Sequence, residues 1–273
     1  MKKSRDYRIV KNEKIADQIY QMTVFAPDIA RASAPGQFVH IRIPGDSSRI
    51  LRRPISINYS DGKPGWIQLV YRIAGMGTKQ LSNRKQGERI NLLGPLGKGF
   101  DVSGADRILL IGGGCGVAPL RFPSEKWPNR KYCSALGFQN RSSAYQVPEF
   151  SLFSEEIRVA TEDGSLGSKG MVTDLAEDMI KREKPDRILA CGPIPMLKKV
   201  QRLAEKYRVS CQLSLEERMG CGIGGCLTCV CSIAEKDGWQ YKRVCTDGPV
   251  FDSKEVIWDD EINFIHETLR RGV

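Results

Sequence analysis

Four cysteines within eleven residues, set among glycines, constrain this chain more than any other stretch. The segment reads ERMGCGIGGCLTCVC and places Cys221, Cys226, Cys229 and Cys231 close together, while Cys245 follows in RVCTDGPVF. A C-x4-C-x2-C spacing with a later fourth cysteine is typical of plant-type 2Fe–2S clusters. The spacing therefore predicts a cluster held by Cys221, Cys226, Cys229 and Cys245.

A cluster-binding loop needs glycines for a physical reason. Three thiolates from one loop can converge on a small cluster only where the backbone approaches closely and turns its N–H groups inward. The glycines are Gly220, Gly222, Gly224 and Gly225. A structural zinc site using the same sulfurs is the alternative, although zinc loops more often use paired C-x2-C knuckles. Cys231 alternates with Cys229 along an expected strand, so we predict that it is not a ligand.

The number of cysteines and the net charge limit the classes of protein to which this chain can belong. Nine cysteines, an odd number, favour metal or redox use over a disulfide framework. The basic start MKKSRDYRIV is not followed by an apolar signal region, and no window is apolar enough to span a membrane, so we expect a cytoplasmic protein. The net charge of +10 is scattered, without a basic helix or zinc-finger spacing. It favours anionic cofactors or an acidic partner protein over nucleic acid.

The chain divides into three parts, for which we expect a β-barrel plus α/β architecture. Residues 1–102 contain short runs rich in β-branched and aromatic residues, which predict a small antiparallel barrel that the glycine-rich GERINLLGPLGKGF closes with turns. Residues 103–216 alternate apolar strands with helical patterns, which predicts a parallel sheet. Residues 217–273 form a small cysteine module with a hairpin over 230–251 and a terminal helix in DDEINFIHETLRR.

A strand that runs into glycines predicts a nucleotide-phosphate site in ILLIGGGCGVAPL. Backbone N–H groups of such a turn face an anion. The glycines concerned are Gly112, Gly113, Gly114 and Gly116. A tight strand-to-helix turn of any α/β sheet is the alternative. Pro123 and Pro128 follow closely, so the helix after this turn should be short.

Two further stretches contain residues of the kind that bind ligands. Cys191 in RILACGPIPML should lie at the carboxyl edge of the parallel sheet, where ligands bind, but residue chemistry alone favours a buried core cysteine. In LRRPISINY, Arg52 and Arg53 are either a solvated charge pair or a phosphate clamp beside the hydroxyl of Ser56.

Taken together, these stretches resemble the ferredoxin–NADP reductase superfamily. The barrel with RRPIS, the glycine turn and Cys-Gly-Pro carry this resemblance over nearly the whole chain. The loop LEERMGCGIGGCLTCVC and the stretch CTDGPVF narrow it to the family of bacterial dihydroorotate dehydrogenase B electron-transfer subunits. Cys115 departs from the superfamily pattern, because it stands in the glycine turn where a small aliphatic residue or threonine is usual.

The resemblance implies FAD on the barrel and NAD on the α/β domain. The flavin motif falls on Arg53, Pro54, Ile55 and Ser56, and the second flavin-contacting strand on Val70, Tyr71 and Arg72. The turn at the flavin pyrophosphate falls on Gly77 and Thr78, and the segment beside the nicotinamide on Cys191, Gly192 and Pro193.

The implied function is electron transfer within a larger enzyme. We find no acid–base residues in a substrate pocket of the chain's own, and so assign no catalytic residue. The resemblance implies a hetero-oligomer, a heterotetramer being one arrangement, with an FMN-containing dihydroorotate dehydrogenase catalytic subunit. Its electrons would pass through the 2Fe–2S cluster and FAD to NAD in pyrimidine biosynthesis. Two alternatives stay open: a reductase subunit that serves a sulfite reductase, hydrogenase or transhydrogenase, and a zinc-bearing binding protein.

Overall fold

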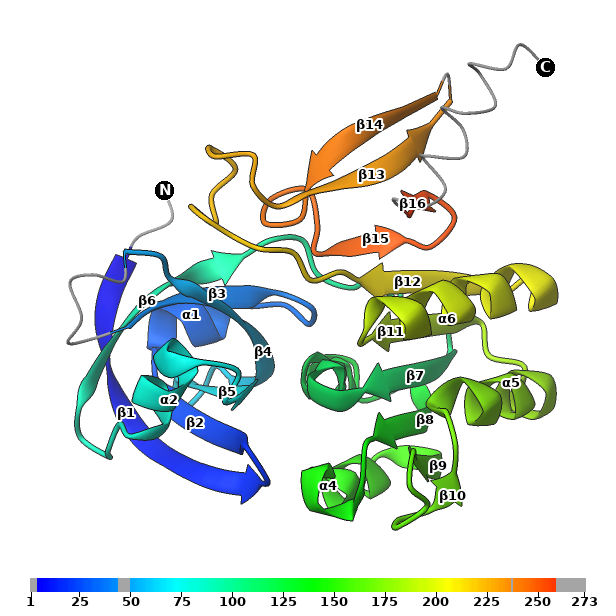
Figure 1. Cartoon of the computed structure of the whole chain (residues 1–273), viewed down its shortest axis with the longest axis horizontal. Helices are drawn as coiled ribbons and strands as arrows, with labels where there is room; N and C mark the ends of the chain where they lie inside the picture. Colours follow the sequence, from blue (N-terminus) through cyan, green and yellow to red (C-terminus); the bar gives the residue numbers. More distant parts are fainter. Residues whose placement is uncertain (1–3, 44–49, 237, 259–273) are drawn as a thin grey trace.

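The computed structural model describes residues 4–43, 50–236 and 238–258. A barrel and a larger sheet lie side by side, and a small sheet lies at one edge of the larger sheet, with the loop that leads into it reaching toward the barrel (Figure 1). The helix expected over 259–271 lies outside the described residues. Within the described ranges, no helix combines the length and apolar character needed to cross a membrane.

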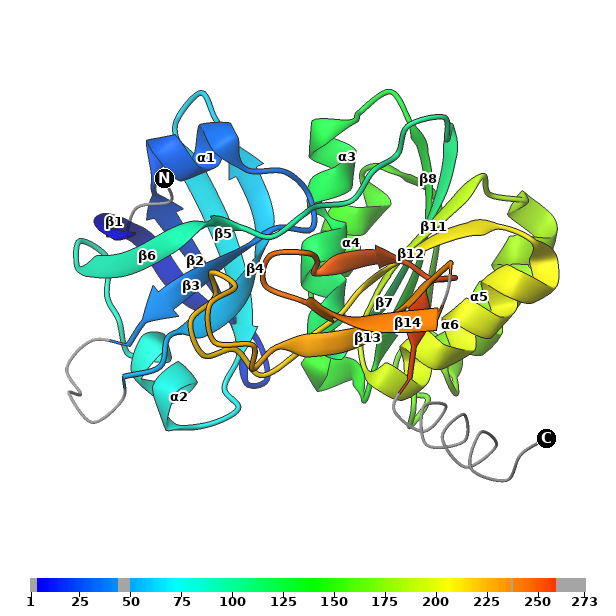
Figure 2. The ribbon, with the colours of Figure 1, turned by 90° about the horizontal axis from the view of Figure 1, so that it is seen from above.

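The first part is a closed six-stranded antiparallel barrel, as predicted. Its strands follow the order β1-β2-β5-β4-β3-β6. They are β1 (Ser4–Ala16), β2 (Ile19–Phe25), β3 (Phe38–Arg42), β4 (Arg53–Asp61), β5 (Trp66–Arg72) and β6 (Arg89–Leu96). Two short helices, α1 (Pro27–Ala32) and α2 (Met76–Ser82), lie at opposite ends of the barrel (Figure 2). Side chains of alternate strand positions, such as Ile41, Ile57 and Leu69, fill the interior and are fully buried.

Strand β6 corrects the expectation for the end of the barrel. Residues 89–96 form a full strand, not only turns, and pair with both β1 and β3. Strand β1 was not recognised from its sequence because much of its surface is exposed and charged, as at Arg5 and Arg8. These two strands close the barrel and leave no open edge.

The second part is a seven-stranded sheet in the order β10-β9-β8-β7-β11-β12-β15. Its strands are β7 (Arg107–Gly113), β8 (Lys131–Phe138), β9 (Ser154–Thr161), β10 (Ser168–Lys169), β11 (Arg187–Cys191), β12 (Ser210–Ser214) and β15 (Val250–Asp252). All neighbours pair in parallel except β12 and β15, so the predicted parallel sheet is confirmed.

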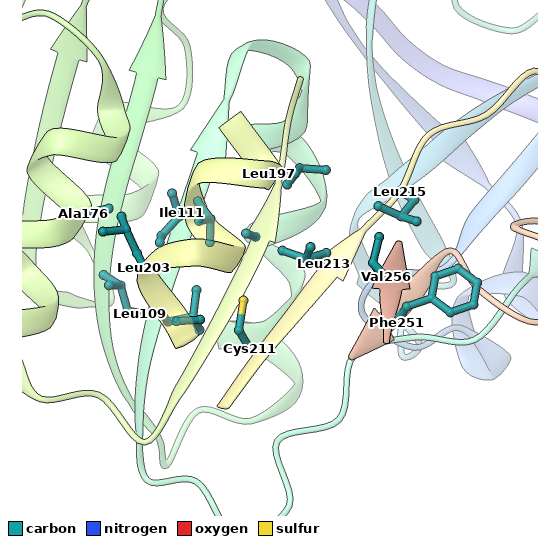
Figure 3. Packing of buried hydrophobic residues seen from close by; sticks show 14 of the residues in the cluster. Leu109, Ile111, Ala176, Leu197, Leu203, Cys211, Leu213, Leu215, Phe251 and Val256 are labelled. Carbon is teal, nitrogen blue, oxygen red and sulfur yellow. The ribbon is translucent and has the colours of Figure 1, made fainter. Parts of the chain in front are cut away.

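Helices cover both faces of this sheet (Figure 2). On one side lie α5 (Val172–Glu183) and α6 (Ile194–Tyr207), and on the other α3 (Phe122–Lys126) and α4 (Val147–Ser151). The 3-10 helices η1 (Gly114–Leu120) and η2 (Arg141–Ser143) follow β7 and β8, respectively. Strand β7 shows why both faces are apolar. Leu109 and Ile111 pack in the cluster that contains α5 and α6, as Figure 3 shows, while Ile108 and Leu110 pack with η1 and α4.

The third part is a small antiparallel sheet of β14 (Gly238–Arg243), β13 (Val230–Glu235) and β16 (Val256–Ile257). The predicted hairpin is present over β13 and β14 but does not extend to residue 251. Strand β15 instead pairs with β12 at the edge of the large sheet. Its Phe251 belongs to the same buried cluster as Leu213 and Val256 (Figure 3), so apolar burial decides where this strand pairs.

Candidate functional site

The cysteine loop connects β12 to β13 and directs backbone N–H groups at sulfur. The N–H of Cys221 donates to Cys226 Sγ over 3.3 Å, and those of Ile223 and Gly225 donate to Cys221 Sγ over 3.4 and 3.2 Å. The hydroxyl of Thr228 donates to Cys226 Sγ over 3.2 Å. This hydroxyl is the largest cause that lowers the pKa of Cys226, to about 6. These hydrogen bonds therefore favour the thiolate form of Cys226, the form that an iron–sulfur cluster requires.

The four predicted ligands come together as two pairs. Cys221 and Cys226 share the contacts above, while Cys229 and Cys245 are both buried, and the Cys229 side chain contributes to the raised pKa of Cys245. Burial is the largest cause that raises the pKa of Cys245, to about 11. Among described residues, no three His, Cys, Asp or Glu side chains are grouped closely enough for a single metal ion. A pairwise donor set fits a binuclear cluster, with two thiolates for each iron, and the ligand assignment stays a prediction.

The loop also lies directly against the barrel. Gly222 has a φ of +71°, and a Cβ there would collide with the ring of His40 on β3. Gly220 likewise leaves room for sulfur, since a Cβ would lie 3.1 Å from Cys226 Sγ. His40 is fully buried, and this burial is the largest cause that lowers its pKa, to about 4. No sequence pattern predicted the contact between His40 and the cysteine loop, because the two are far apart in the sequence.

Side chains around the cysteines differ in exposure. Cys231 is partly buried and packs against the large core cluster, and burial is the largest cause that raises its pKa, to about 12. Met219 packs against the same cluster. Ile223 and Leu227 instead expose 59% and 62% of their surface, so the loop presents apolar side chains to solvent.

The two adjacent arginines of the flavin motif have different surroundings. Arg52 donates to Asn91 Oδ1 over 2.6 Å and to the carbonyl of His40 over 3.1 Å, and so supports the barrel wall. Arg53 starts β4 and lies beside Gly77, where a Cβ would be 3.3 Å from its Nε. A guanidinium beside a residue without a side chain fits an anion such as a pyrophosphate.

The other predicted flavin residues lie on β4, β5 and α2. Pro54, Ile55 and Ser56 are partly buried on β4, beside β3, while Val70 belongs to the cluster between barrel and sheet, and Arg72 is exposed. Tyr71 points into the barrel, and its hydroxyl donates to Asn12 Oδ1 over 2.9 Å. Its side chain is thus occupied within the barrel. Thr78 Oγ1 accepts from the N–H of Ala74 over 2.9 Å and so shapes the turn before α2.

The glycine turn and the Cys-Gly-Pro segment pack against each other. A Cβ at Gly116 would collide with the carbonyl of Cys191, and one at Gly113 would lie 3.1 Å from Pro193 Cδ. At Gly112 the close neighbour is Val117, and at Gly192 it is Met196. Gly114 differs, because it has a φ of +54° and open space around its Cβ position. The other four glycines therefore serve close packing, whereas Gly114 leaves the turn open.

The segment after this turn is short, as its prolines predict. The chain forms the 3-10 helix η1 and then the five-residue helix α3. At the same sheet edge Cys191 is buried, and burial is the largest cause that raises its pKa, to about 12. Glu216 adds to this rise. Glu216 follows β12. A second residue near the glycine turn is Tyr145, whose hydroxyl donates to the carbonyls of Gly114 and Cys115 over 3.1 and 3.2 Å. The sequence patterns did not single out Glu216 or Tyr145, although the position of Glu216 shortly after a predicted strand could have indicated a residue at the sheet edge.

Comparison with known proteins agrees with this arrangement. Residues 216–257 match the family model of the iron–sulfur cluster binding domain of dihydroorotate dehydrogenase B. Relatives from Caldanaerobacter subterraneus subsp. tengcongensis and Geobacillus thermodenitrificans are 41% and 42% identical to this chain. The first alignment covers 92% of this chain and 97% of the relative, and the second covers 91% and 96%. Both relatives are the electron transfer subunit of dihydroorotate dehydrogenase B (NAD(+)).

Solved structures show the same fold. An NADH-dependent reduced ferredoxin–NADP oxidoreductase superposes with a TM-score of 0.83 at 32% identity, covering 94% of this chain and 91% of the other. A ferredoxin NADP+ reductase from Neisseria gonorrhoeae, solved with FAD and NADP, superposes with a TM-score of 0.63 at 14% identity, covering 75% and 92%.

Proposed function

This chain belongs to the family of dihydroorotate dehydrogenase B electron transfer subunits, and on that premise we propose that it passes electrons from an FMN-containing dihydroorotate dehydrogenase subunit to NAD through a 2Fe–2S cluster and FAD. One observation carries the proposal. The loop of the cluster ligands touches His40, and His40 pairs across the sheet with Pro54 of the flavin motif. The two candidate sites are therefore separated by a single barrel strand, which suits electron transfer between them.

When bound, the cluster carries single electrons, FAD exchanges electrons singly or in pairs, and NAD accepts a hydride. The chain's own residues bind and orient these groups. Cys221, Cys226, Cys229 and Cys245 would hold the irons, and Arg53 with the turn at Gly77 would hold the FAD pyrophosphate. The edge formed by Gly114, Gly116 and Cys191–Pro193 would receive the nicotinamide nucleotide.

We assign these roles to three regions. Residues 1–102 bind FAD, residues 103–216 bind NAD, and residues 217–273 carry the cluster. Strand β15 supports a rigid attachment of the third region, because it pairs with β12 of the second. We also propose a cytoplasmic location, since none of the nine cysteines forms a disulfide.

Purification of the chain with its partner under anaerobic conditions tests the proposal. We expect flavin bands, broad iron–sulfur absorption and about two irons per chain. Mixing the complex with dihydroorotate and NAD should give orotate and NADH. Stoichiometric zinc in place of iron, or flavin-free protein, would reject the proposed function.

A second candidate is a reductase subunit that serves another electron donor or acceptor. The superposition with the NADH-dependent reduced ferredoxin–NADP oxidoreductase, at 32% identity, favours it. Affinity capture of the tagged chain from its native cells separates the two. An FMN-containing dihydroorotate dehydrogenase subunit supports the first candidate, and any other redox subunit in its place supports the second.

A further inference from the structure

Two buried amide side chains join the barrel to the α/β domain. Asn58 lies on β4, and Gln146 precedes α4. Asn58 Nδ2 donates to Gln146 Oε1 over 2.9 Å, and Gln146 Nε2 donates back to Asn58 Oδ1 over 3.0 Å. Asn58 has no exposed surface and Gln146 has 6%. The pair is therefore a reciprocal contact sealed from water between two domains.

The remaining donors of this pair extend the connection. Asn58 Nδ2 also donates to the carbonyl of Ala118 in η1 over 2.7 Å, and Gln146 Nε2 donates to Gln21 Oε1 on β2 over 2.9 Å. Each amide N–H of Asn58 and Gln146 thus has an acceptor, and each oxygen has a donor. In this way β4 is held to η1 and to Gln146, and β2 is held to Gln146.

The backbone at Gln146 points to a functional constraint. Its φ of +55° is left-handed, a conformation that residues other than glycine rarely keep unless their surroundings enforce it. The preceding side chain, Tyr145, donates to the carbonyls of Gly114 and Cys115 in the glycine turn. Two consecutive side chains therefore reach in two directions, Tyr145 to the glycine turn and Gln146 to the flavin-binding strand.

We propose that Asn58, Tyr145 and Gln146 are positioning residues for hydride transfer between nicotinamide and flavin. The inference rests on the proposed function. Asn58 lies two residues after Ser56 of the flavin motif, while Ala118 and Gly114 belong to one helical segment at the expected nucleotide site. The network therefore fixes the distance between the two sites. Hydride transfer requires reacting atoms about 3–3.5 Å apart, and a displacement of about 1 Å costs roughly a hundredfold in rate.

The test follows flavin reduction by NADH in a single turnover of the loaded complex. In this step the C–H bond of NADH breaks, and the hydride with its two electrons joins FAD, giving NAD+ and the reduced flavin anion. We expect Asn58→Leu and Gln146→Leu each to lower the limiting rate at saturating NADH about 10- to 100-fold, while the apparent Kd for NADH changes less than about threefold.

The double variant Asn58→Leu/Gln146→Leu separates positioning from stability. It leaves neither amide of the pair without its partner, so its thermal midpoint should exceed that of either single variant. Its limiting rate should nevertheless stay as low, because the hydrogen bonds from Asn58 to Ala118 of η1 and from Gln146 to Gln21 of β2 are absent. Gln201→Leu is the matched control. It removes a buried amide that donates to the carbonyls of Ser253 and Val256, so it should lower stability without slowing flavin reduction.

Hydrogen–deuterium exchange gives a readout that does not depend on activity. Segments 114–120 and 144–150 should exchange faster in the double variant than in the wild type, and not in Gln201→Leu. A limiting rate within twofold of the wild type in the double variant would overturn the inference, whatever the exchange shows. A wild-type flavin that NADH does not reduce would instead reject the proposed function.

Discussion

Arg52 and Arg53 are neighbours in the sequence with different surroundings, so their substitutions should have different effects. If Arg53 binds the FAD pyrophosphate as we propose, Arg53→Ala removes a charge-assisted contact worth roughly 1.5–3 kcal/mol. FAD binding should weaken about ten- to a hundredfold. Arg52→Ala should affect FAD less, because Arg52 bonds the barrel wall at Asn91 and His40. Titration of flavin-stripped protein with FAD measures both, and equal FAD affinity in Arg53→Ala and the wild type would refute the assignment.

The cysteines allow a second prediction at the residue scale. Serine at Cys221, Cys226, Cys229 or Cys245 should remove or destabilise the cluster, because serine is a poor ligand for iron in this type of site. Cys231→Ser should keep the wild-type spectrum, since this side chain packs against buried hydrophobic residues of the protein core. Absorption and electron paramagnetic resonance spectra of the five variants check this. Loss of the cluster in Cys231→Ser with its retention in Cys245→Ser would identify Cys231 as the fourth ligand.

At the scale of elements, the exposed tip of the cysteine loop is the part we expect to meet the partner subunit. Leu227 is apolar, 62% exposed and follows Cys226, one of the four predicted ligands. Leu227→Glu would bury a charge in the contact and should cost about 3 kcal/mol, a loss of roughly a hundredfold in affinity. The cluster spectrum and NADH–dye activity should stay unchanged.

Leu152→Glu is the matched control for this loop. Leu152 is 86% exposed and follows α4, which lies away from the cysteine loop (Figure 1). Gel filtration with the partner and NAD-linked dihydroorotate oxidation measure the effect. If Leu227→Glu still co-elutes and supports full turnover, the loop tip is not the docking surface.

Sequence patterns predicted elements where local composition and tertiary burial agree. Strands such as β5 and β7 were recognised from apolar and β-branched runs. Strand β1 was missed because its outward face is charged, and β15 was misplaced because its partner, β12, is distant in the sequence. The cysteine spacing predicts the cluster site locally. Asn58 and Gln146, by contrast, are 88 residues apart and meet only through the packing of two domains, which no local pattern contains.

At the scale of the whole molecule, the antiparallel pairing of β12 with β15 has a topological consequence. Ser214 and Val250 are paired neighbours, and Leu215 donates to the carbonyl of Pro249 over 2.9 Å. Everything between them, including the cysteines and the β13–β14 hairpin, is an insertion whose two ends meet, as in a hairpin with an oversized turn. Such an insertion can be gained or lost without changing the topology of the rest of the chain.

Excision should therefore uncouple the two kinds of electron chemistry. Replacing residues 217–248 by a short Asn-Gly turn keeps β12 and β15 paired, because this turn suits adjacent antiparallel strands. The shortened chain should lose iron–sulfur absorption and dihydroorotate-linked turnover, yet retain FAD and NADH–dye reduction. Loss of FAD together with the cluster would show that the barrel needs the insertion. Retention of FAD would show a complete two-electron flavoenzyme into which an entry point for single electrons has been inserted at a single sheet edge.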